Sequence, residues 1–355
     1  MAPRPIDPDR TGIALDPRQF AACILQRPLV GWIEAAVDEL AGNEPARRAL
    51  AALRDAWPLG LRAGAFSLGS ARGLDTRPLD DLAGLSARLD PARIVVRLAW
   101  PTCDGDATNP QLPLPYDDET LIRVGRDVDA IQARLRRPVL IENPPARRHR
   151  LNSALDEAQF LAALVRQTGC GIACDLANLL VGTRNHGGDP QRWLDALPGS
   201  SVGMVRIAGH GTIARADGAV LIADGAGPVP GAVWALHGIA ARRFPGAPTM
   251  LAWTAGPVRL DRLAAEATRA DRWRRAALDM SIAYAEAPAA SPDEIAGTRF
   301  FEFGSGGIAS RSPIAAAQRR GVPFPPGGHA DRAASDRAAR VGGTVAAAGP
   351  SAVPA

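Results

Sequence analysis

Residues 138–143, Pro-Val-Leu-Ile-Glu-Asn, and residues 171–175, Gly-Ile-Ala-Cys-Asp, are short apolar runs that reach a carboxylate near their ends. Residues 153–166, which lie between them, have the 3.6-residue apolar spacing of a helix. This order recurs along the chain, where six further runs resemble buried strands: 12–15, 30–34, 59–64, 93–99, 203–208 and 248–253. Near-continuous apolar strands separated by helices predict a parallel sheet that is covered on both faces.

The number of these units decides between two α/β architectures. Eight strand and helix units within about 280 residues predict a closed TIM (β/α)8 barrel. An open, doubly wound sheet is the alternative, and it would place a glycine-rich phosphate turn after its first strand. The residues at that point, Leu15-Asp16-Pro17-Arg18, do not form such a turn, which favours the barrel.

The chain divides into three predicted parts. Residues 1–288 make up the TIM barrel domain, which closes with an amphipathic helix over residues 260–285. Residues 289–328 contain four phenylalanines among glycines and prolines, and we expect an extension that packs on the barrel without a core of its own. Residues 329–355 contain no Phe, Tyr, Trp, Leu or Ile, so this segment is expected to be a disordered tail.

Composition excludes several classes of partner. All 41 basic residues are arginine, and the net charge of +4 is small for 355 residues, so neither nucleic acid nor an anionic membrane is an expected partner. The longest uncharged stretch, residues 225–241, is interrupted by proline and glycine and does not predict a membrane span. Four scattered cysteines and an N-terminus without an apolar signal segment predict a cytoplasmic protein.

Charged side chains end most of the predicted strands. In a TIM barrel the carboxyl ends of the strands meet on one face, where they line the site. A single carboxylate at such a position can simply cap the next helix. Because both signs of charge recur from strand to strand, we expect a charge network at the barrel mouth formed by Glu34, Arg62, Arg97, Glu142, Asp175 and Arg206.

Seven short motifs follow one another in a fixed order over roughly residues 12–269. They are Trp32-Ile33-Glu34, Ser67-Leu68-Gly69-Ser70, Leu112-Pro113-Leu114-Pro115-Tyr116, Ile141-Glu142-Asn143, Asp175-Leu176-Ala177-Asn178, Asn185-His186-Gly187-Gly188-Asp189-Pro190 and Ala208-Gly209-His210. In this order they resemble the multinuclear non-heme iron-dependent oxidases, which include the oxidase of methanobactin biosynthesis. The resemblance implies a xylose-isomerase-like TIM barrel, an iron cofactor and a precursor or leader peptide as the substrate, with a possible partner protein of the same pathway.

The sequence departs from this family at the metal ligands that the resemblance implies. Family histidines correspond to Arg62, Arg97 and Arg206 here. A guanidinium group stays protonated, has no lone pair to donate and repels a cation. We therefore predict no metal cofactor, and we expect the three arginines to neutralise Glu142, Asp175 and Glu34 in place of the cluster.

Two interpretations of the arginines remain open. Either the site has been remade to bind an anion or a peptide carboxylate, or the arginines arose by drift, since one base change converts a histidine codon into an arginine codon. The first interpretation predicts a pseudoenzyme that binds a peptide or a partner protein during ribosomal peptide maturation. The alternative function is a residual iron-dependent oxidase, with its metal held by Glu142, Asp175, Asn178 and His210.

Overall fold

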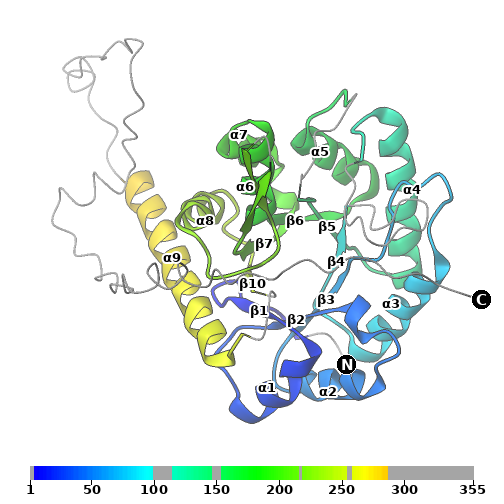
Figure 1. The fold of residues 1–355 in the computed structure, drawn as a ribbon, viewed down its shortest axis with the longest axis vertical. Coiled ribbons are helices and arrows are strands. Elements are labelled where there is room, and N and C mark those ends of the chain that lie inside the picture. The colour runs from blue at the N-terminus through cyan, green and yellow to red at the C-terminus, as the bar shows by residue number, and fades with distance from the viewer. Residues whose placement is uncertain (1–3, 99–113, 146–152, 216–217, 254–257, 287–355) are drawn as a thin grey trace, which may run out of the picture. The chain divides into compact units, whose positions relative to one another are not determined.

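A computed structural model describes residues 4–98, 114–145, 153–215, 218–253 and 258–286. All eight predicted strands are present and close into one parallel barrel, in which successive barrel strands pair and the last pairs with the first (Figure 1). The barrel strands are β1 (Gly12–Leu15), β2 (Ile33–Ala36), β3 (Leu59–Ala63), β4 (Arg93–Arg97), β5 (Leu140–Glu142), β6 (Gly171–Asp175), β7 (Val202–Ala208) and β10 (Thr249–Ala252). The predicted TIM barrel is confirmed.

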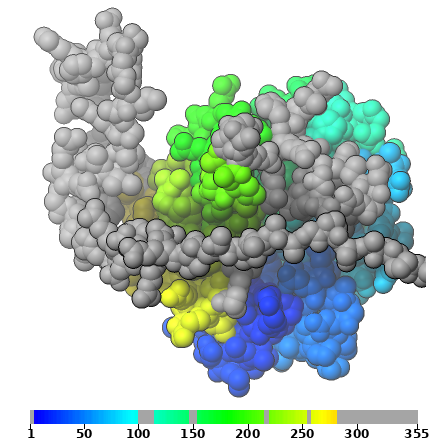
Figure 2. Space-filling view, in the orientation of Figure 1, coloured from blue at the N-terminus to red at the C-terminus, as the bar shows by residue number. Residues whose placement is uncertain are grey.

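Helices surround the barrel, and the colours of the space-filling view follow one another around this face of the molecule in chain order (Figure 2). The α-helices are α1 (Phe20–Gln26), α2 (Glu44–Arg54), α3 (Thr76–Leu89), α4 (Asp118–Leu135), α5 (Glu157–Thr168), α6 (Leu176–His186), α7 (Pro190–Ala196), α8 (Gly231–Arg243) and α9 (Leu260–Glu286). Short 3-10 helices are η1 (Pro17–Gln19), η2 (Val37–Leu40) and η3 (Gly199–Ser201). Aspartate side chains cap α3, α4 and α5 and thereby fix where these helices begin.

The interior of the barrel is filled by layers of side chains. In a lower layer, the ring of Trp32 lies against Gly12 and Gly60, where an added Cβ atom would come within 2.5 and 2.7 Å of that ring. The side chain of Leu140 lies in the same way against Gly171 and Gly203. Successive side chains of a strand alternate between its two faces, so the residues two positions further on also point inward. The residues two positions after Trp32, Gly60 and Leu140 are charged: Glu34, Arg62 and Glu142.

An antiparallel hairpin that the sequence did not predict follows β7 and is formed by β8 (Gly211–Arg215) and β9 (Gly218–Ile222). The pattern used to find strands was that of buried parallel strands. Thr212, Ile213 and Ala214 in β8 are exposed instead, so β8 lacks that pattern, whereas the apolar run of β9 is half-buried and was not assigned to a strand.

The predicted last helix is confirmed as α9. The predicted extension at residues 289–328 and the predicted tail at residues 329–355 lie outside the described residues, and both stay predictions. Within the described part of the chain, no helix combines the length and apolar character that a membrane crossing requires.

Candidate functional site

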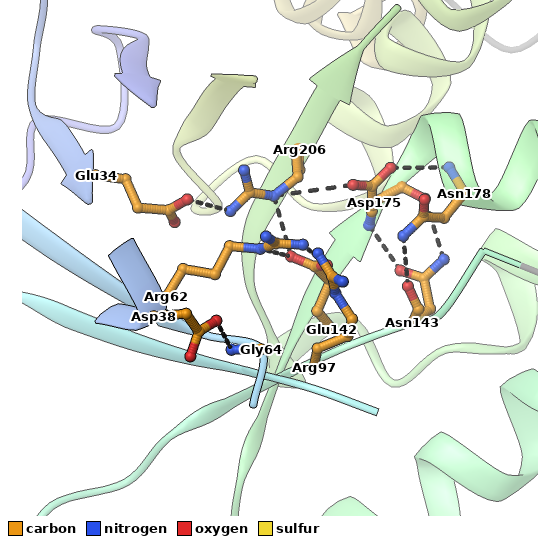
Figure 3. A network of polar contacts seen from close by, with 10 residues as sticks. All are labelled: Glu34, Asp38, Arg62, Gly64, Arg97, Glu142, Asn143, Asp175, Asn178 and Arg206. Carbon is orange, nitrogen blue, oxygen red and sulfur yellow. Dashed lines mark hydrogen bonds and ion pairs between the residues drawn. The ribbon is translucent and has the colours of Figure 1, made fainter. Parts of the chain in front are cut away.

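A cavity of about 320 Å³ opens at the carboxyl ends of the barrel strands. Five of the six residues predicted for the barrel mouth line it: Glu34, Arg62, Arg97, Asp175 and Arg206. The sixth, Glu142, is fully buried and touches the three arginines. The structure therefore brings the predicted set together at one end of the barrel, as Figure 3 shows.

Glu142 lies at the centre of the charge network. Arg62 donates two hydrogen bonds to it, from Nε to Oε2 at 2.8 Å and from Nη2 to Oε1 at 2.5 Å. Arg206 Nε lies 3.1 Å from Oε2 of Glu142, and Arg97 Nε lies 3.5 Å from Oε1. Three guanidinium groups thus converge on one buried carboxylate (Figure 3).

Arg206 links this carboxylate to two others. Its Nη2 donates to Oε1 of Glu34 at 2.5 Å, and its Nε lies 3.8 Å from Oδ2 of Asp175. Strand register explains part of the arrangement, because Arg206 of β7 pairs with Asp175 of β6, and Arg97 of β4 pairs with Glu142 of β5. Arg206 is only 3% exposed, so its charge depends on these partners rather than on water.

Two asparagines fix the end of β6. Asn143 accepts a hydrogen bond from the backbone N–H of Asp175 at 2.7 Å and donates to its carbonyl oxygen at 3.0 Å. Asn178 donates from its side chain to the carbonyl oxygen of Asn143. Its backbone N–H donates to the Asp175 carboxylate at 2.8 Å, so that Asp175 caps α6. Asn143 was absent from the predicted site residues, although its place directly after Glu142 is a signal that could have identified it.

The rim of the cavity adds three carboxylates that were not among the predicted site residues: Asp16, Glu39 and Asp224. Asp16 and Asp224 lie in segments that follow β1 and β9, and Glu39 lies in η2 after β2, so reading the strand ends alone could not find them. Asp16 is paired with Arg18 at 2.7 Å, and Asp224 accepts from the backbone N–H of Ala226. Burial and the nearby charge of Asp16 raise the pKa of Glu39.

Burial and neighbouring charges set the ionisation of the network. Burial by itself would raise the pKa of Glu142, but the charges of Arg62 and Arg206 hold it well below its usual range. Burial and the charge of Glu142 raise the pKa of Asp175. Burial would lower the pKa of Arg62, whereas the charge and hydrogen bonds of Glu142 raise it. Glu142 and Arg62 therefore both stay charged at neutral pH.

Arg97 is the least compensated of the three arginines. Burial and the positive charge of Arg62 lower its pKa to about 10, so it still carries a charge at neutral pH. Within the described residues its Nε atom has no hydrogen-bond partner, and the same holds for Oε2 of Glu34. Both residues line the cavity. Nε of Arg206, which also lines the cavity, is a further buried donor without a hydrogen bond to the described residues.

The motifs and the barrel geometry have a counterpart among known proteins. Over residues 10–275 the chain matches the family described as "RiPP precursor modification enzyme MbnB/TglH/ChrH", where RiPP denotes a ribosomally made, modified peptide. The chain belongs to this family. The family predicted from the seven sequence motifs is thereby confirmed.

Relatives of this MbnB/TglH/ChrH family member occur in several bacteria. A UPF0276 protein of Bordetella pertussis is 38% identical over 237 residues, which cover 66% of this chain and 82% of that protein. A UPF0276 protein of an Anaeromyxobacter species is 35% identical over 271 residues, which cover 75% and 93% of the two chains. These relatives confirm the family and carry no more specific name.

Solved structures support the barrel type of this MbnB/TglH/ChrH family member. An L-ribulose 3-epimerase matches with a TM-score of 0.50 at 14% identity, covering 82% of this chain and 99% of the epimerase. A xylose isomerase-like TIM barrel protein from Mycobacterium smegmatis matches with a TM-score of 0.50 at 11% identity, covering 76% and 97%. At such identities the likeness shows the fold alone, which is the predicted xylose-isomerase-like TIM barrel.

The residues present do not fit the iron that the MbnB/TglH/ChrH resemblance implied. Within the described ranges, no three His, Cys, Asp or Glu side chains are grouped so that they could hold a metal ion. Of the alternative ligand set, Glu142, Asp175 and Asn178 lie together, but His210 is not among the residues that line the cavity. Arginine donors already lie against the oxygens of Glu142, and a guanidinium group cannot serve as a ligand.

Proposed function

We propose that this chain is a metal-free member of its family that binds a peptide carboxylate at the barrel mouth. In this role it serves ribosomal peptide maturation as a binding or partner protein, a pseudoenzyme without a cofactor. The observation that carries the proposal is the state of Arg97, a charged, partly exposed side chain that lines the cavity and has only a 3.5 Å ion pair with Glu142 among the described residues.

The charge balance of the network supports this function. Arg62 and Arg206 donate short hydrogen bonds to Glu142 and Glu34, whereas among the described residues Arg97 makes only a 3.5 Å ion pair with Glu142. Its side chain remains 20% exposed, compared with 3% for Arg206. An arginine in this condition gains most from a ligand carboxylate, which can accept two parallel hydrogen bonds from one guanidinium group.

Tolerated drift accounts less well for the same arrangement. Drift requires only that an arginine fit, but Arg62 forms a two-point contact with Glu142, and Arg206 spans Glu34, Glu142 and Asp175. A buried carboxylate without a partner of opposite charge costs about 3–5 kcal/mol. Without a metal ion these carboxylates would carry that cost, and each arginine contact offsets it. These contacts support compensation by selection.

The test compares two forms of one synthetic probe, the C-terminal segment of a ribosomal precursor peptide. Titration calorimetry should show binding of the free-acid form and at least about tenfold weaker binding of the C-terminal amide. Arg97→Gln should remove that preference, whereas Arg88→Gln, which alters an exposed pair with Glu44, should leave it unchanged. Equal affinity of both forms for the unaltered protein would contradict the proposal.

Membership of an enzyme family supports a second candidate, a residual iron-dependent oxidase that modifies a precursor peptide. In this case Glu142, Asp175, Asn178 and His210 would supply the ligands, and Arg62 would have to release Glu142. Iron can be quantified in protein purified without oxygen. One bound iron per chain, abolished by Glu142→Ala, would establish this candidate and overturn the metal-free proposal.

A further inference from the structure

The two outer edges of the hairpin β8–β9 differ. On β9, the side chain of Asn185 from α6 donates from Nδ2 to the carbonyl oxygen of Leu221 at 2.9 Å. The backbone N–H of Leu221 donates back to Oδ1 of Asn185 at 3.0 Å. The amide of Asn185 thus occupies the position of a neighbouring strand, and this edge is closed.

The register of the hairpin shows what β8 presents on its other edge. Leu221 lies opposite Thr212, and its N–H and C=O both point away from β8, so the two residues form a non-hydrogen-bonded pair. Because such pairs alternate along an antiparallel ladder, the next one is Ala214 opposite Ala219. Thr212 and Ala214 must therefore direct their N–H and C=O groups away from β9.

The outer edge of β8 is open among the described residues. Thr212 and Ala214 make no backbone hydrogen bond to another described residue outside the hairpin ladder, and both residues are exposed. Ile213 between them is 45% exposed, so no described element covers this part of β8. An unpaired, exposed edge strand is a template for pairing with a further strand.

The hairpin connects directly to the cavity. Gly209, two residues before β8, lines the cavity, and so do Ala223, Asp224 and Gly225, which follow β9. The Gly211 end of β8 is therefore next to the barrel mouth, and the strand leads away from it toward the hairpin turn. A strand added antiparallel to β8 would run toward the cavity, and its C-terminal end would arrive at the mouth.

We propose that the outer edge of β8 is the docking strand for an extended peptide, which adds antiparallel to the hairpin as a third strand. Backbone hydrogen bonds to Thr212 and Ala214 hold the peptide, and its C-terminal carboxylate enters the cavity that contains Arg97. This inference rests on the proposed function for the carboxylate, and it adds the surface that selects an extended chain.

The experiment uses the same precursor segment, cut to about eight residues so that it spans β8 and reaches the cavity. Ala214→Pro removes one outward N–H without removing a bond of the ladder, since proline is tolerated on an edge strand. Fluorescence anisotropy should show about tenfold weaker binding of the peptide to this variant. Ala219→Pro is the matched control, because it removes the outward N–H of the paired residue on the opposite edge and should leave affinity unchanged.

A second probe separates this inference from the proposed function. The last two residues of the same peptide can reach the cavity but cannot pair along β8, so Ala214→Pro should not affect their binding. Arg97→Gln should weaken both probes. If Ala214→Pro leaves the longer peptide unaffected while Arg97→Gln weakens it, edge docking is wrong and the proposed function stands. If only Ala214→Pro weakens it, docking stands and the carboxylate role of Arg97 is wrong.

Methylated peptides test the docking without altering the protein. In a peptide paired with β8, successive N–H groups point alternately toward β8 and toward solvent. Methylating every second nitrogen therefore removes either the donors that face β8 or the donors that face solvent. We expect one set of alternate positions to lower affinity about tenfold and the other set to have little effect. Uniform effects along the peptide would overturn docking as a third strand, even if Ala214→Pro proves to unfold the hairpin.

Discussion

Two layers of the barrel interior are built from the same strands but are stabilised in different ways. In the lower layer Trp32 and Leu140 fill the space left by glycines on neighbouring strands. Two residues further along those strands, Glu34 and Glu142 fill the next layer and are held by arginines. All four side chains are buried, at 0–9% exposure. The lower layer depends on matched volume, and the upper layer depends on matched charge.

This difference determines how each layer responds to a change. A side chain lost from the lower layer leaves a cavity, whose cost follows the missing volume and contacts. A charge lost from the upper layer leaves its partners buried and uncompensated, which a second, charge-restoring change can relieve. Substitutions in the two layers should therefore differ in whether a partner substitution rescues them.

The largest effect is expected from Glu142→Ala, which leaves three arginines opposite two carboxylates. We expect a loss of about 5 kcal/mol in the free energy of unfolding, measured by urea denaturation. Replacing Arg62 and Glu142 together by methionine leaves two arginines opposite Glu34 and Asp175, so the double variant should recover at least half of the loss. Additive losses of the two single variants would contradict charge matching.

Trp32→Ala tests the lower layer. Removing a fully buried indole should lower the free energy of unfolding by about 4 kcal/mol, because the neighbouring strands cannot close the space. Trp32→Phe should cost less than half as much, since it keeps most of the volume. When Trp32→Ala is combined with a substitution of Arg62 or Glu142, the two losses in free energy of unfolding should simply add. Rescue by either would show that the layers are not independent.

Acid titration tests a third buried group, the neutral imidazole of His237. His237 of α8 lies 2.9 Å from Oγ1 of Thr249, and burial together with the charge of Arg274 lowers its pKa to about 4. The unfolded chain takes up this proton near pH 6.5, so the contribution of His237 is present above that pH and is lost as pH falls toward 4. Over this window, His237→Gln should remove up to about 3 kcal/mol of pH dependence.

The measurement for this prediction is the difference between the two stability curves. Asp175 acts in the opposite sense, because its raised pKa makes folding less favourable as pH rises through the range where it ionises. Its contribution is common to the unaltered protein and to His237→Gln, and it cancels in the difference. Parallel curves between pH 4 and 6.5 would show that His237 does not titrate as expected.

Gly60→Ala should have the smallest effect of the four. Its Cβ atom would lie 2.7 Å from the ring of Trp32, so the lower layer must shift, at a cost of about 2 kcal/mol in thermal or urea unfolding. Gly84→Ala in α3 is the matched control, because no atom lies within 4 Å of the added carbon. We expect this control to stabilise the protein by about 0.5–1 kcal/mol. Destabilisation by both would point to backbone effects rather than volume.

Much of the fold could be predicted from local pattern. The alternation of apolar runs and helical spacing located all eight barrel strands, because each of these signals is contained in a few consecutive residues. The hairpin β8–β9 was missed, because Thr212, Ile213 and Ala214 of β8 are exposed and the apolar run of β9 is only half-buried on the outside of the barrel. The rim acids Asp16, Glu39 and Asp224 were also missed, because their positions at the cavity depend on segments beyond the strand ends.

The sequence by itself determined that charges of both signs end the strands, since that fact belongs to each run separately and barrel closure only gathers them. Tertiary structure alone decided how the charges are shared. Strand register and side-chain length bring three arginines to Glu142, and they leave Arg97 with the longest of these contacts. In the same way, only the packing of α6 brings Asn185 to β9 and closes one edge of the hairpin, because that contact joins residues 36 positions apart.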